Sequence, residues 1–294
     1  MLRWLVTGAS GMLGRDLVIA LERCGEEVTG LARTDLDVSD ENAVSAELRR
    51  HRPSVVVNCA AWTGVNDAEA HEEEAFRVNG HGAACVASAC ADIGAHLVHM
   101  STDYVFSGES RHPYAEHEAA QPRTAYGRTK LAGELAVLQR LPNTGYVVRT
   151  AWLYGEHGPN FVRTMLRLER ELRNIDVVDD QQGQPTWAGD AANQIIALVR
   201  SGAAAGIYHA TSSGKATWFE FAQEIFRLSG ADPARILPTT RAAYSRGAGG
   251  ANCGPRRPRY SVLGHGAWAA AGIQPIMNWR RALSRALPLI AATA

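Results

Sequence analysis

A tyrosine and a lysine four residues apart are the residues of this chain best suited to proton transfer. Tyr126 and Lys130 stand in the segment Ala125-Tyr-Gly-Arg-Thr-Lys130, and a helix would place them on one face. There the ammonium group of the lysine would lower the pKa of the phenol. Because the same spacing is common on solvated helix faces, the interpretation depends on the elements that position the pair.

A glycine-rich turn near the N-terminus indicates a cofactor site. Gly8, Gly11 and Gly14 follow an apolar run over residues 2–6 and open a helical pattern that continues to Cys24. Glycines at such a turn let the backbone approach a pyrophosphate, and the helix N-terminus faces the negative charge. The spacing differs from the G-x-G-x-x-G fingerprint, yet its place between a strand and a helix favours dinucleotide binding over a purely structural turn.

The end of the second apolar run bears on the choice between NADPH and NADH. No acidic residue directly follows Leu31, where one would bind the ribose 2'-hydroxyl, whereas Arg33 can bind a 2'-phosphate. This difference favours NADPH. A solvated loop arginine is the alternative interpretation, and the nearby Asp35 and Asp37 could also serve NADH.

Hydroxyl groups follow the fourth apolar run, over residues 96–100. Ser101, Thr102 and Asp103 stand at the carboxyl end of this expected central strand, where open α/β sheets bind ligands. Thr102 can donate a hydrogen bond to a substrate carbonyl oxygen. The alternative role is capping of the local backbone, which is common for a hydroxyl at a strand end.

Short apolar runs alternate with longer helical patterns through the first half of the chain. The runs cover residues 4–7, 27–31, 54–58, 96–100 and 145–149. Such alternation predicts right-handed βαβ units, hence an α/β fold with a Rossmann-type doubly wound parallel sheet. Residues 1–150 are therefore expected to form an NAD(P)-binding domain.

The pattern after residue 150 predicts a second, smaller α/β lobe that binds the substrate. Residues 151–294 carry helical patterns at 160–173 and 217–229 among clusters of glycine, proline and aromatic residues. The strand at 175–178 and the helix around 191–200 are expected to return to the first lobe. The boundary between the two lobes is therefore expected to be discontinuous.

Length, charge and composition indicate a globular protein with a small-molecule ligand. The chain has 294 residues, and 30 basic residues balance 30 acidic ones, so a nucleic-acid or membrane partner is not expected. No signal peptide or membrane span is evident, which makes the cytoplasm the expected location. The five cysteines are an odd number without a C-x-x-C pair and are interpreted as reduced, mostly buried thiols. The histidines lack a third ligand at metal spacing, so no metal site is expected.

Several longer motifs resemble those of one protein family. They are Asn58-Cys-Ala-Ala-Trp-Thr63, Ser101-Thr-Asp-Tyr-Val-Phe106, Tyr126-Gly-Arg-Thr-Lys-Leu-Ala-Gly-Glu134, Arg149-Thr-Ala-Trp-Leu-Tyr-Gly155, Asn160-Phe-Val-Arg-Thr-Met165 and Gly183-Gln-Pro-Thr186. Together with the glycine turn they resemble the extended short-chain dehydrogenase/reductase superfamily and, within it, the dTDP-4-dehydrorhamnose reductase group. The resemblance runs nearly end to end, and several motifs are long enough to be individually specific.

The resemblance implies reduction of the C4 ketone of a dTDP-linked 4-keto-6-deoxyhexose, for rhamnose or for a deoxysugar of secondary metabolism. NADPH would supply the hydride, with NADH as the alternative cofactor. Tyr126 would give a proton to the carbonyl oxygen, and Thr102 would hydrogen-bond the ketone. Lys130 would lower the pKa of Tyr126 and hold the nicotinamide ribose.

The motifs and the resemblance together give two sets of binding residues. The cofactor set is Gly8, Ser10, Gly11, Met12, Gly14, Arg33, Asp37, Val38, Ala60, Ala61, Trp62, Tyr126 and Lys130. The substrate set is Thr102, Asp103, Tyr126, Trp152, Asn160 and Arg257. Arg257 is included because guanidinium groups suit phosphates. It lies with Arg256 and Arg259 in a Gly- and Arg-rich stretch, Ala243 to Arg259, which is predicted to be a loop. In the alternative interpretation, these arginines are exposed and serve only solubility.

Other activities of the superfamily and one class of non-enzyme are the alternatives. The 4,6-dehydratases carry Thr-Asp-Glu, whereas Tyr104 follows Asp103 here, so dehydration is rejected. A nucleotide-sugar C4 epimerase would also use Tyr126 and Lys130 and stays open. A non-catalytic NADP-binding regulatory subunit is the alternative outside enzymes, and the intact Thr102, Tyr126 and Lys130 argue against it. The expected partners are a nucleotide-sugar substrate and, for a homodimer, a second copy of the chain.

Overall fold

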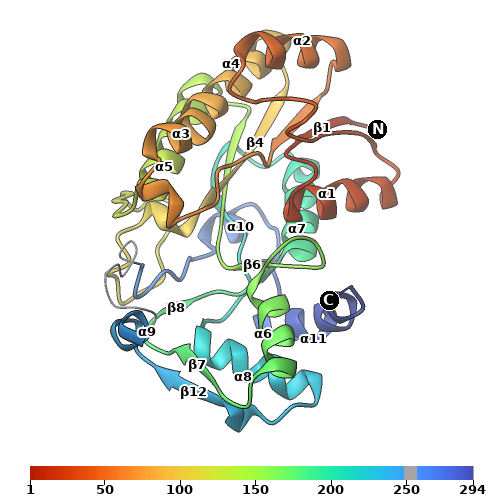
Figure 1. Ribbon diagram of the computed structural model, residues 1–294. Coiled ribbons are helices and arrows are strands. Elements are labelled where there is room, and N and C mark those ends of the chain that lie inside the picture. Colours follow the sequence, from red (N-terminus) through yellow and green to blue (C-terminus); the bar gives the residue numbers. More distant parts are fainter. Residues whose placement is uncertain (248–256, 294) are drawn as a thin grey trace.

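The computed structural model describes residues 1–247 and 257–293 (Figure 1). The strands are β1 (Arg3–Thr7), β2 (Glu27–Leu31), β3 (Val55–Asn58), β4 (His96–Thr102), β5 (Gly145–Thr150), β6 (Leu153–Tyr154), β7 (Ile175–Val178), β8 (Gln182–Gly183), β9 (Thr186–Trp187), β10 (Gly206–His209), β11 (Ala216–Thr217) and β12 (Ile236–Thr239). The α-helices are α1 (Met12–Arg23), α2 (Glu41–His51), α3 (Glu72–Phe76), α4 (Ala83–Ile93), α5 (Ala125–Arg140), α6 (Phe161–Glu171), α7 (Ala188–Ser201), α8 (Trp218–Ser229), α9 (Arg241–Gly247), α10 (Gly266–Ala270) and α11 (Trp279–Ala291). Short helical turns complete the set, namely the π-helix η2 (Arg77–Gly82) and the 3-10 helices η1 (Asp67–Glu69), η3 (Asp103–Val105) and η4 (Pro233–Arg235).

A six-stranded parallel sheet forms the centre of the larger part of the molecule. Its strand order is β10-β5-β4-β3-β1-β2, which is the doubly wound arrangement expected from the alternating pattern, and the predicted fold class is confirmed. The register places Thr7 beside Asn58 and Thr102 beside Thr150. The carboxyl ends of these neighbouring strands therefore present polar side chains along one edge of the sheet.

Helices cover both faces of this sheet because alternate strand residues point to opposite sides. In β1, Trp4 and Val6 pack with α1 and α7 on one face, whereas Leu5 packs with α2, α4 and α5 on the other. Helix α1 is capped at Cys24. The next residue, Gly25, has a φ of 71°, and this left-handed conformation ends the helix. The two apolar layers hold the glycine turn and α5 in fixed positions at the carboxyl edge.

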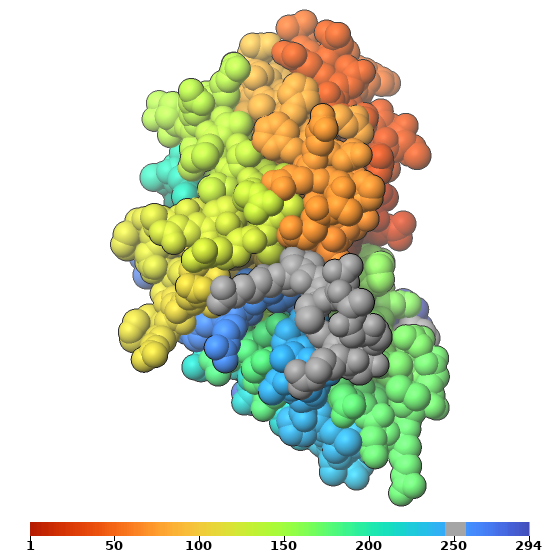
Figure 2. Space-filling model, turned by 60° about the vertical axis from the view of Figure 1, so that its left-hand side comes forward, coloured from red at the N-terminus to blue at the C-terminus, as the bar shows by residue number. Residues whose placement is uncertain are grey.

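A smaller lobe has a hydrophobic core of its own. Helices α6, α8 and α11 pack around the paired strands β7 and β12, with Trp279 and Phe221 fully buried between them. Figure 2 shows the red, orange and yellow-green segments in the upper part of the molecule, and the green segment of α6 and the light-blue segments in the lower part. The chain passes between the two parts several times, since α7, β10 and α10 all pack with the large sheet.

Two expectations about the second half of the chain need correction. The strand over Ile175–Val178 pairs with β12 in the small lobe, so it does not return to the large sheet; β10 does, as the strand beside β5. The stretch from Ala243 to Arg259 is not wholly a loop, because its start belongs to helix α9, which begins at Arg241. Residues 248–256, including Arg256 and Cys253, lie outside the described residues.

The thiols, the helices and the potential metal ligands of the described residues bear on three further expectations. Cys85 and Cys90 are buried, Cys59 is half-buried and Cys24 is exposed, and all four are free. No helix within residues 1–247 or 257–293 is long and apolar enough to cross a bilayer. The same ranges contain no group of three or more potential metal ligands.

Candidate active site

Two cavities meet at the carboxyl edge of the large sheet. The larger, of about 620 Å³, begins at the glycine turn, and the smaller, of about 310 Å³, lies between the sheet and the small lobe. They share one wall, which is formed by Thr63, Ser101, Tyr126, Thr150 and Leu153. Tyr126 could therefore touch a ligand in either cavity.

The larger cavity collects the predicted cofactor residues from four segments of the chain. All of them line it: Gly8, Ser10, Gly11, Met12, Gly14, Arg33, Asp37, Val38, Ala60, Ala61, Trp62, Tyr126 and Lys130. Gly8 has φ of 65°, and a Cβ atom there would lie 2.7 Å from the Ala60 nitrogen. At Gly14 a Cβ atom would lie 2.4 Å from the Gly8 carbonyl oxygen. Only glycine fits these two positions, because the turn packs closely on itself and on the segment that follows β3.

The far end of the larger cavity carries the guanidinium group of Arg33, for which no hydrogen bond to a carboxylate is found among the described residues. The Asp35 carboxylate accepts the Ala32 backbone N–H at 2.8 Å, and Asp37 accepts both the backbone N–H and the hydroxyl of Ser39. These bonds from Ser39 lower the pKa of Asp37. Both carboxylates that could bind a ribose hydroxyl are thus engaged in local turns, whereas Arg33 lines the cavity with an exposed side chain.

Helix α5 presents Tyr126 and Lys130 on the face that lines the larger cavity. The helix begins at Thr124, whose hydroxyl accepts the Gly127 backbone N–H at 3.0 Å. A Cβ atom at Gly127 would lie 2.2 Å from the Tyr104 carbonyl oxygen, so the first turn of α5 packs directly on η3. This close packing fixes the position of Tyr126 relative to Thr102 at the end of β4.

The ionisation of Tyr126 differs from the sequence-based expectation. Desolvation of the phenol raises the pKa of Tyr126 well above its usual range, and the hydrogen bond with Thr102 only partly opposes this effect. The expected lowering of the pKa by Lys130 is therefore wrong for this arrangement. A tyrosine with a raised pKa keeps its proton and can act as an acid.

Lys130 is buried and its amine contacts the interior of the sheet. The side chain is 2% exposed, and Nζ donates a hydrogen bond of 2.6 Å to the Met100 carbonyl oxygen. The Nε2 atom of His99 lies 3.4 Å from the same nitrogen. Burial lowers the pKa of Lys130 to about 8, and the charge of Glu134 partly opposes this shift.

Thr102 and Asp103 form the floor of the smaller cavity. The Thr102 hydroxyl donates to Asp103 Oδ1 at 3.0 Å and accepts the Tyr104 backbone N–H at 3.2 Å. Thr102 thus caps η3, as the alternative interpretation held, and its side chain also lines the cavity. Burial raises the pKa of Asp103 to about 6, against the hydrogen bond from Thr102.

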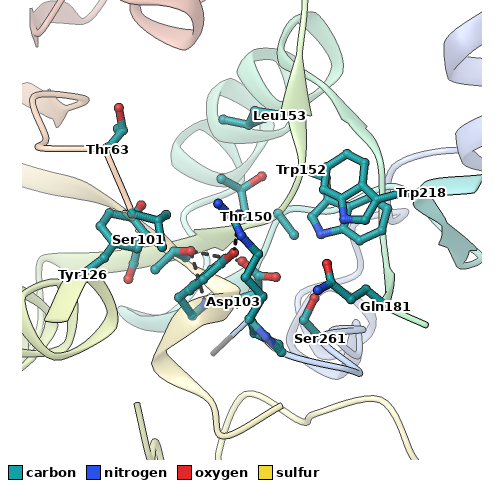
Figure 3. A pocket seen from close by; sticks show the side chains of 16 residues that line it. Thr63, Ser101, Asp103, Tyr126, Thr150, Trp152, Leu153, Gln181, Trp218 and Ser261 are labelled. Carbon is teal, nitrogen blue, oxygen red and sulfur yellow. Dashed lines mark hydrogen bonds between the residues drawn. The ribbon is translucent and has the colours of Figure 1, made fainter. Parts of the chain in front are cut away.

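The opposite wall of the smaller cavity is aromatic. Figure 3 shows Trp152 and Trp218 lying parallel, with Gln181 and Ser261 next to them and Tyr126 across the cavity. The two indole rings stack with centroids 3.6 Å apart. A flat aromatic wall suits the apolar face of a sugar or a nucleobase.

The predicted substrate residues separate into two groups. Thr102, Asp103, Tyr126, Trp152 and Arg257 line the smaller cavity. Asn160 lines neither cavity. Its side chain caps α6 by accepting the Arg163 backbone N–H at 3.2 Å and donates to the Gly155 carbonyl oxygen at 2.9 Å, so its role in this structure is to shape the loop before α6.

Sequence reasoning missed several cavity residues. In the smaller cavity they are Thr63, Val65, Tyr104, Thr150, Ala151, Leu153, Gln181, Trp218, Pro258 and Ser261. The Thr150 hydroxyl is buried and has no hydrogen-bond partner among the described residues. The sequence could have indicated Thr150, because it ends the strand next to the one that carries Thr102, and the carboxyl ends of neighbouring strands meet at one edge of the sheet.

The composition of the site suits a dinucleotide beside a second polar ligand, and comparison with known proteins decides the family. A family model described as the RmlD substrate binding domain matches residues 2–291. The chain belongs to this family. The resemblance drawn from the motifs is therefore confirmed.

Several proteins that are similar to this chain are named as reductases of dTDP sugars. A dTDP-4-keto-6-deoxy-D-glucose reductase of Streptomyces niveus is 56% identical over 290 residues, covering 99% of this chain and 98% of the relative. A dTDP-4-dehydrorhamnose reductase of Streptomyces griseus is 53% identical over 296 residues, covering 99% and 95%. The crystal structure of dTDP-4-dehydrorhamnose reductase from Bacillus anthracis in complex with NADP superposes with a TM-score of 0.91 at 36% identity, covering 98% of this chain and 99% of that one.

Proposed function

We propose that this protein uses NADPH to reduce the C4 ketone of a dTDP-linked 4-keto-6-deoxyhexose to an alcohol. One observation carries the proposal most directly: Tyr126 lines both cavities, so its hydroxyl group can reach the junction between a cofactor and a substrate. The similar proteins named as reductases of dTDP-linked ketosugars support the substrate class.

The residues of the larger cavity fit NADPH. The backbone at Gly8, Gly11 and Gly14 would face the pyrophosphate at the start of α1. Arg33 would bind the 2'-phosphate, since the neighbouring carboxylates are held in turns. Lys130 would contact the nicotinamide ribose from α5. When bound, NADPH supplies a hydride equivalent for the carbonyl carbon.

Tyr126 and Thr102 would handle the carbonyl oxygen. Reduction adds a hydride to C4 and a proton to the oxygen, and a phenol that keeps its proton is the form needed for this step. The raised pKa of Tyr126 supports that assignment. Thr102 would donate a hydrogen bond to the same oxygen and so favour the negative charge that develops on it during hydride transfer.

The smaller cavity would hold the sugar nucleotide. Asp103 offers carboxylate oxygens to sugar hydroxyls, and Trp152 offers a flat apolar surface. Arg257 donates to the Tyr104 hydroxyl at 3.1 Å and to Asn66 Oδ1 at 3.0 Å, and its guanidinium group would suit the diphosphate. Tyr104 supplies no second carboxyl group for elimination of water, which supports reduction over dehydration.

Location and oligomeric state stay predictions from the sequence. A cytoplasmic site is proposed because free thiols and a reduced nicotinamide cofactor suit that compartment. We also propose a homodimer, without assigning its interface to any part of the described surface.

The test is consumption of NADPH by the purified protein with defined ketosugars. The substrate is dTDP-4-keto-6-deoxy-D-glucose, supplied alone or together with a 3,5-epimerase that converts it to the L-series ketosugar. Turnover with either supply supports the proposal, and the preferred supply identifies the sugar series. Tyr126→Phe should bind NADPH normally and lose about 10²- to 10⁴-fold in kcat. NADPH binding without turnover of either ketosugar would contradict the proposal and favour a regulatory subunit.

A further inference from the structure

Thr150 carries a buried hydroxyl group that the fold leaves unpaired. It is the last residue of β5 and is 8% exposed. Its Oγ1 atom has no hydrogen-bond partner within residues 1–247 and 257–293. A buried hydroxyl group without a partner lowers stability, and nearly all buried polar groups in folded proteins are paired. A ligand that supplies the missing partner would account for this residue.

Thr150 differs from its neighbour Thr102 in the space that it reaches. The two residues are paired in the register of β4 and β5, and Met100 and Val148, two positions before them, pack in the same apolar layer. Because residues two apart in a strand share a face, both threonines point to the same side of the sheet. Thr102 lines the smaller cavity, whereas Thr150 lines both cavities and lies near the centre of Figure 3. A ligand in the larger cavity would therefore contact Thr150.

The larger cavity follows the carboxyl edge of the sheet from β2 to β5. Arg33 lies after β2, the glycine turn after β1, and the segment 59–63 after β3. Met100 and Ser101 of β4 and then Thr150 of β5 continue the wall in the strand order of the sheet. In the proposed function, Arg33 binds the 2'-phosphate at the adenosine end of NADPH. The nicotinamide ring, at the opposite end of the dinucleotide, would then lie beside β4 and β5.

The nicotinamide ring presents one strongly polar group, its carboxamide. This group has a carbonyl oxygen that accepts and an NH2 group that donates, and its burial without hydrogen bonds is unfavourable. Met100 and Leu153 give this end of the larger cavity an apolar lining that suits a flat ring. The Thr150 hydroxyl group can either donate to the carboxamide oxygen or accept from the NH2 group. The carboxamide and the hydroxyl group would thus satisfy each other.

The other polar side chains of the shared wall are engaged or lie further from β5. The Ser101 hydroxyl donates to Glu134 Oε1. The Tyr126 hydroxyl has a hydrogen bond within the protein, and the ketone oxygen is its proposed partner. Thr63 follows β3, which is separated from β5 by β4. Thr150 is the member of this wall that combines a place at β5 with a buried hydroxyl group in need of a partner.

We propose that the Thr150 hydroxyl group binds the carboxamide of the nicotinamide ring and thereby fixes the orientation of the ring at the junction of the two cavities. Thr150 is then a cofactor-binding residue, and its neighbour Thr102 is left to the ketone. Orientation matters here because hydride transfer requires the donor and acceptor carbon atoms to be held in contact. This inference rests on the proposed function, since it assumes that NADPH occupies the larger cavity.

The experiment compares two ligands that differ by the nicotinamide ring. The first is NADPH, and the second is 2'-phospho-ADP-ribose, which keeps the 2'-phosphate, the adenosine and the pyrophosphate but has no ring. Isothermal titration calorimetry gives Kd for each ligand without turnover. Thr150→Val removes the hydroxyl group and keeps the size and the branched shape of the side chain. We expect Kd for NADPH to rise about 10-fold and Kd for 2'-phospho-ADP-ribose to stay unchanged.

Two control variants and one stability measurement sharpen the comparison. Thr150→Ser keeps a hydroxyl group and should bind both ligands as the unmodified chain does. Thr144→Val alters a threonine just before the other end of β5, away from both cavities, and should also leave both Kd values unchanged. Without ligand, Thr150→Val should unfold at the same Tm as the unmodified chain or at a higher one, because the hydroxyl group that it removes is unpaired.

An unchanged Kd for NADPH in Thr150→Val overturns the inference, and so does an equal rise in Kd for both ligands. A lower Tm of unliganded Thr150→Val also overturns it, because the hydroxyl group would then have a partner within the protein. Where the ketosugar assay succeeds, a higher KM for the ketosugar with an unchanged Kd for NADPH would assign Thr150 to the sugar instead. Failure of the proposed function would appear as absent turnover in the ketosugar assay, whereas failure of this inference would appear in the calorimetry of the variant.

Discussion

Trp152 and Trp218 stack face to face, with ring centroids 3.6 Å apart and planes inclined by 6°. The backbone of Trp152 has φ of 47°, a left-handed conformation that is costly for a bulky residue. A Cβ atom at Gly183 would lie 2.4 Å from the Trp152 ring. The ring is thus held between a helix of the small lobe and a glycine, and the strain is located at the wall of the smaller cavity.

This stack leads to a prediction for Trp218. Trp218→Ala removes the surface that orients Trp152 and should raise KM for the ketosugar by about 10-fold, since an aromatic pair contributes roughly 0.5–1.5 kcal/mol beyond the area that it buries. KM for NADPH should stay unchanged, because Trp218 does not line the larger cavity. Trp218→Phe is the matched control and should lose less. Steady-state kinetics with both substrates check the result, and equal effects on the two KM values would contradict the assignment.

A second prediction concerns Arg33 and the choice of cofactor. Arg33→Ser removes the charge-assisted hydrogen bonds expected to the 2'-phosphate and should raise KM for NADPH by about 10- to 100-fold. KM for NADH should change little, so the preference narrows or reverses. Arg15→Ser, an exposed arginine of α1 outside the cavity, is the control and should behave as the unmodified protein. A parallel rise of both KM values in Arg33→Ser would show that Arg33 does not recognise the phosphate.

Asp103 gives a prediction about stability and pH. Because folding raises its pKa to about 6, its contribution to stability is complete below the unfolded-state pKa of about 3.9 and is lost as pH rises through 6. Asp103→Asn places a side chain there that cannot ionise, so the cost of burying a charged carboxylate disappears. The variant should therefore raise the free energy of unfolding by about 1–3 kcal/mol at pH 7.5, and this gain should vanish near pH 4. Urea unfolding at the two pH values measures the difference. Turnover should fall in the same variant, and a gain independent of pH would contradict the raised pKa.

The buried pair Glu134 and Arg149 gives a prediction about coupling. Their side chains are 1% and 2% exposed and joined at 2.7 Å. Glu134→Leu leaves the buried guanidinium group of Arg149 without its partner and should lower the free energy of unfolding by about 3–5 kcal/mol. Arg149→Leu leaves the buried carboxylate of Glu134 without its partner and should have an effect of similar size. The double variant should lose much less than the sum of the two single losses. Additive losses in a double-mutant cycle would show that the pair does not act as one unit.

Local patterns predicted the larger cavity well. The glycine turn and the segments after β2 and β3 line the cavity proposed for the cofactor, and their positions follow from the strand order of a doubly wound sheet. All thirteen predicted cofactor residues, Gly8 to Lys130, line that cavity. Such sites depend on short-range chain geometry, which a sequence pattern expresses directly.

The smaller cavity could be predicted only in part, because its wall depends on contacts between distant segments. Trp218 at the start of α8 stacks on Trp152, 66 residues earlier in the chain. Asn160 belongs to a family motif but caps a helix. The pKa of Tyr126 followed burial rather than the nearby lysine. These outcomes come from tertiary packing, for which spacing along the chain carries no signal.

The transfer of a hydride to C4 of the sugar is the central claim, and isotope transfer tests it most directly. The protein is incubated with NADPH carrying deuterium at both positions of nicotinamide C4 and with the dTDP-linked 4-keto-6-deoxyhexose that it turns over, and the product is analysed by NMR and mass spectrometry. We expect one deuterium per sugar, bound to C4. A C4 epimer formed without deuterium, or NADPH oxidation that leaves the sugar unlabelled, would contradict it.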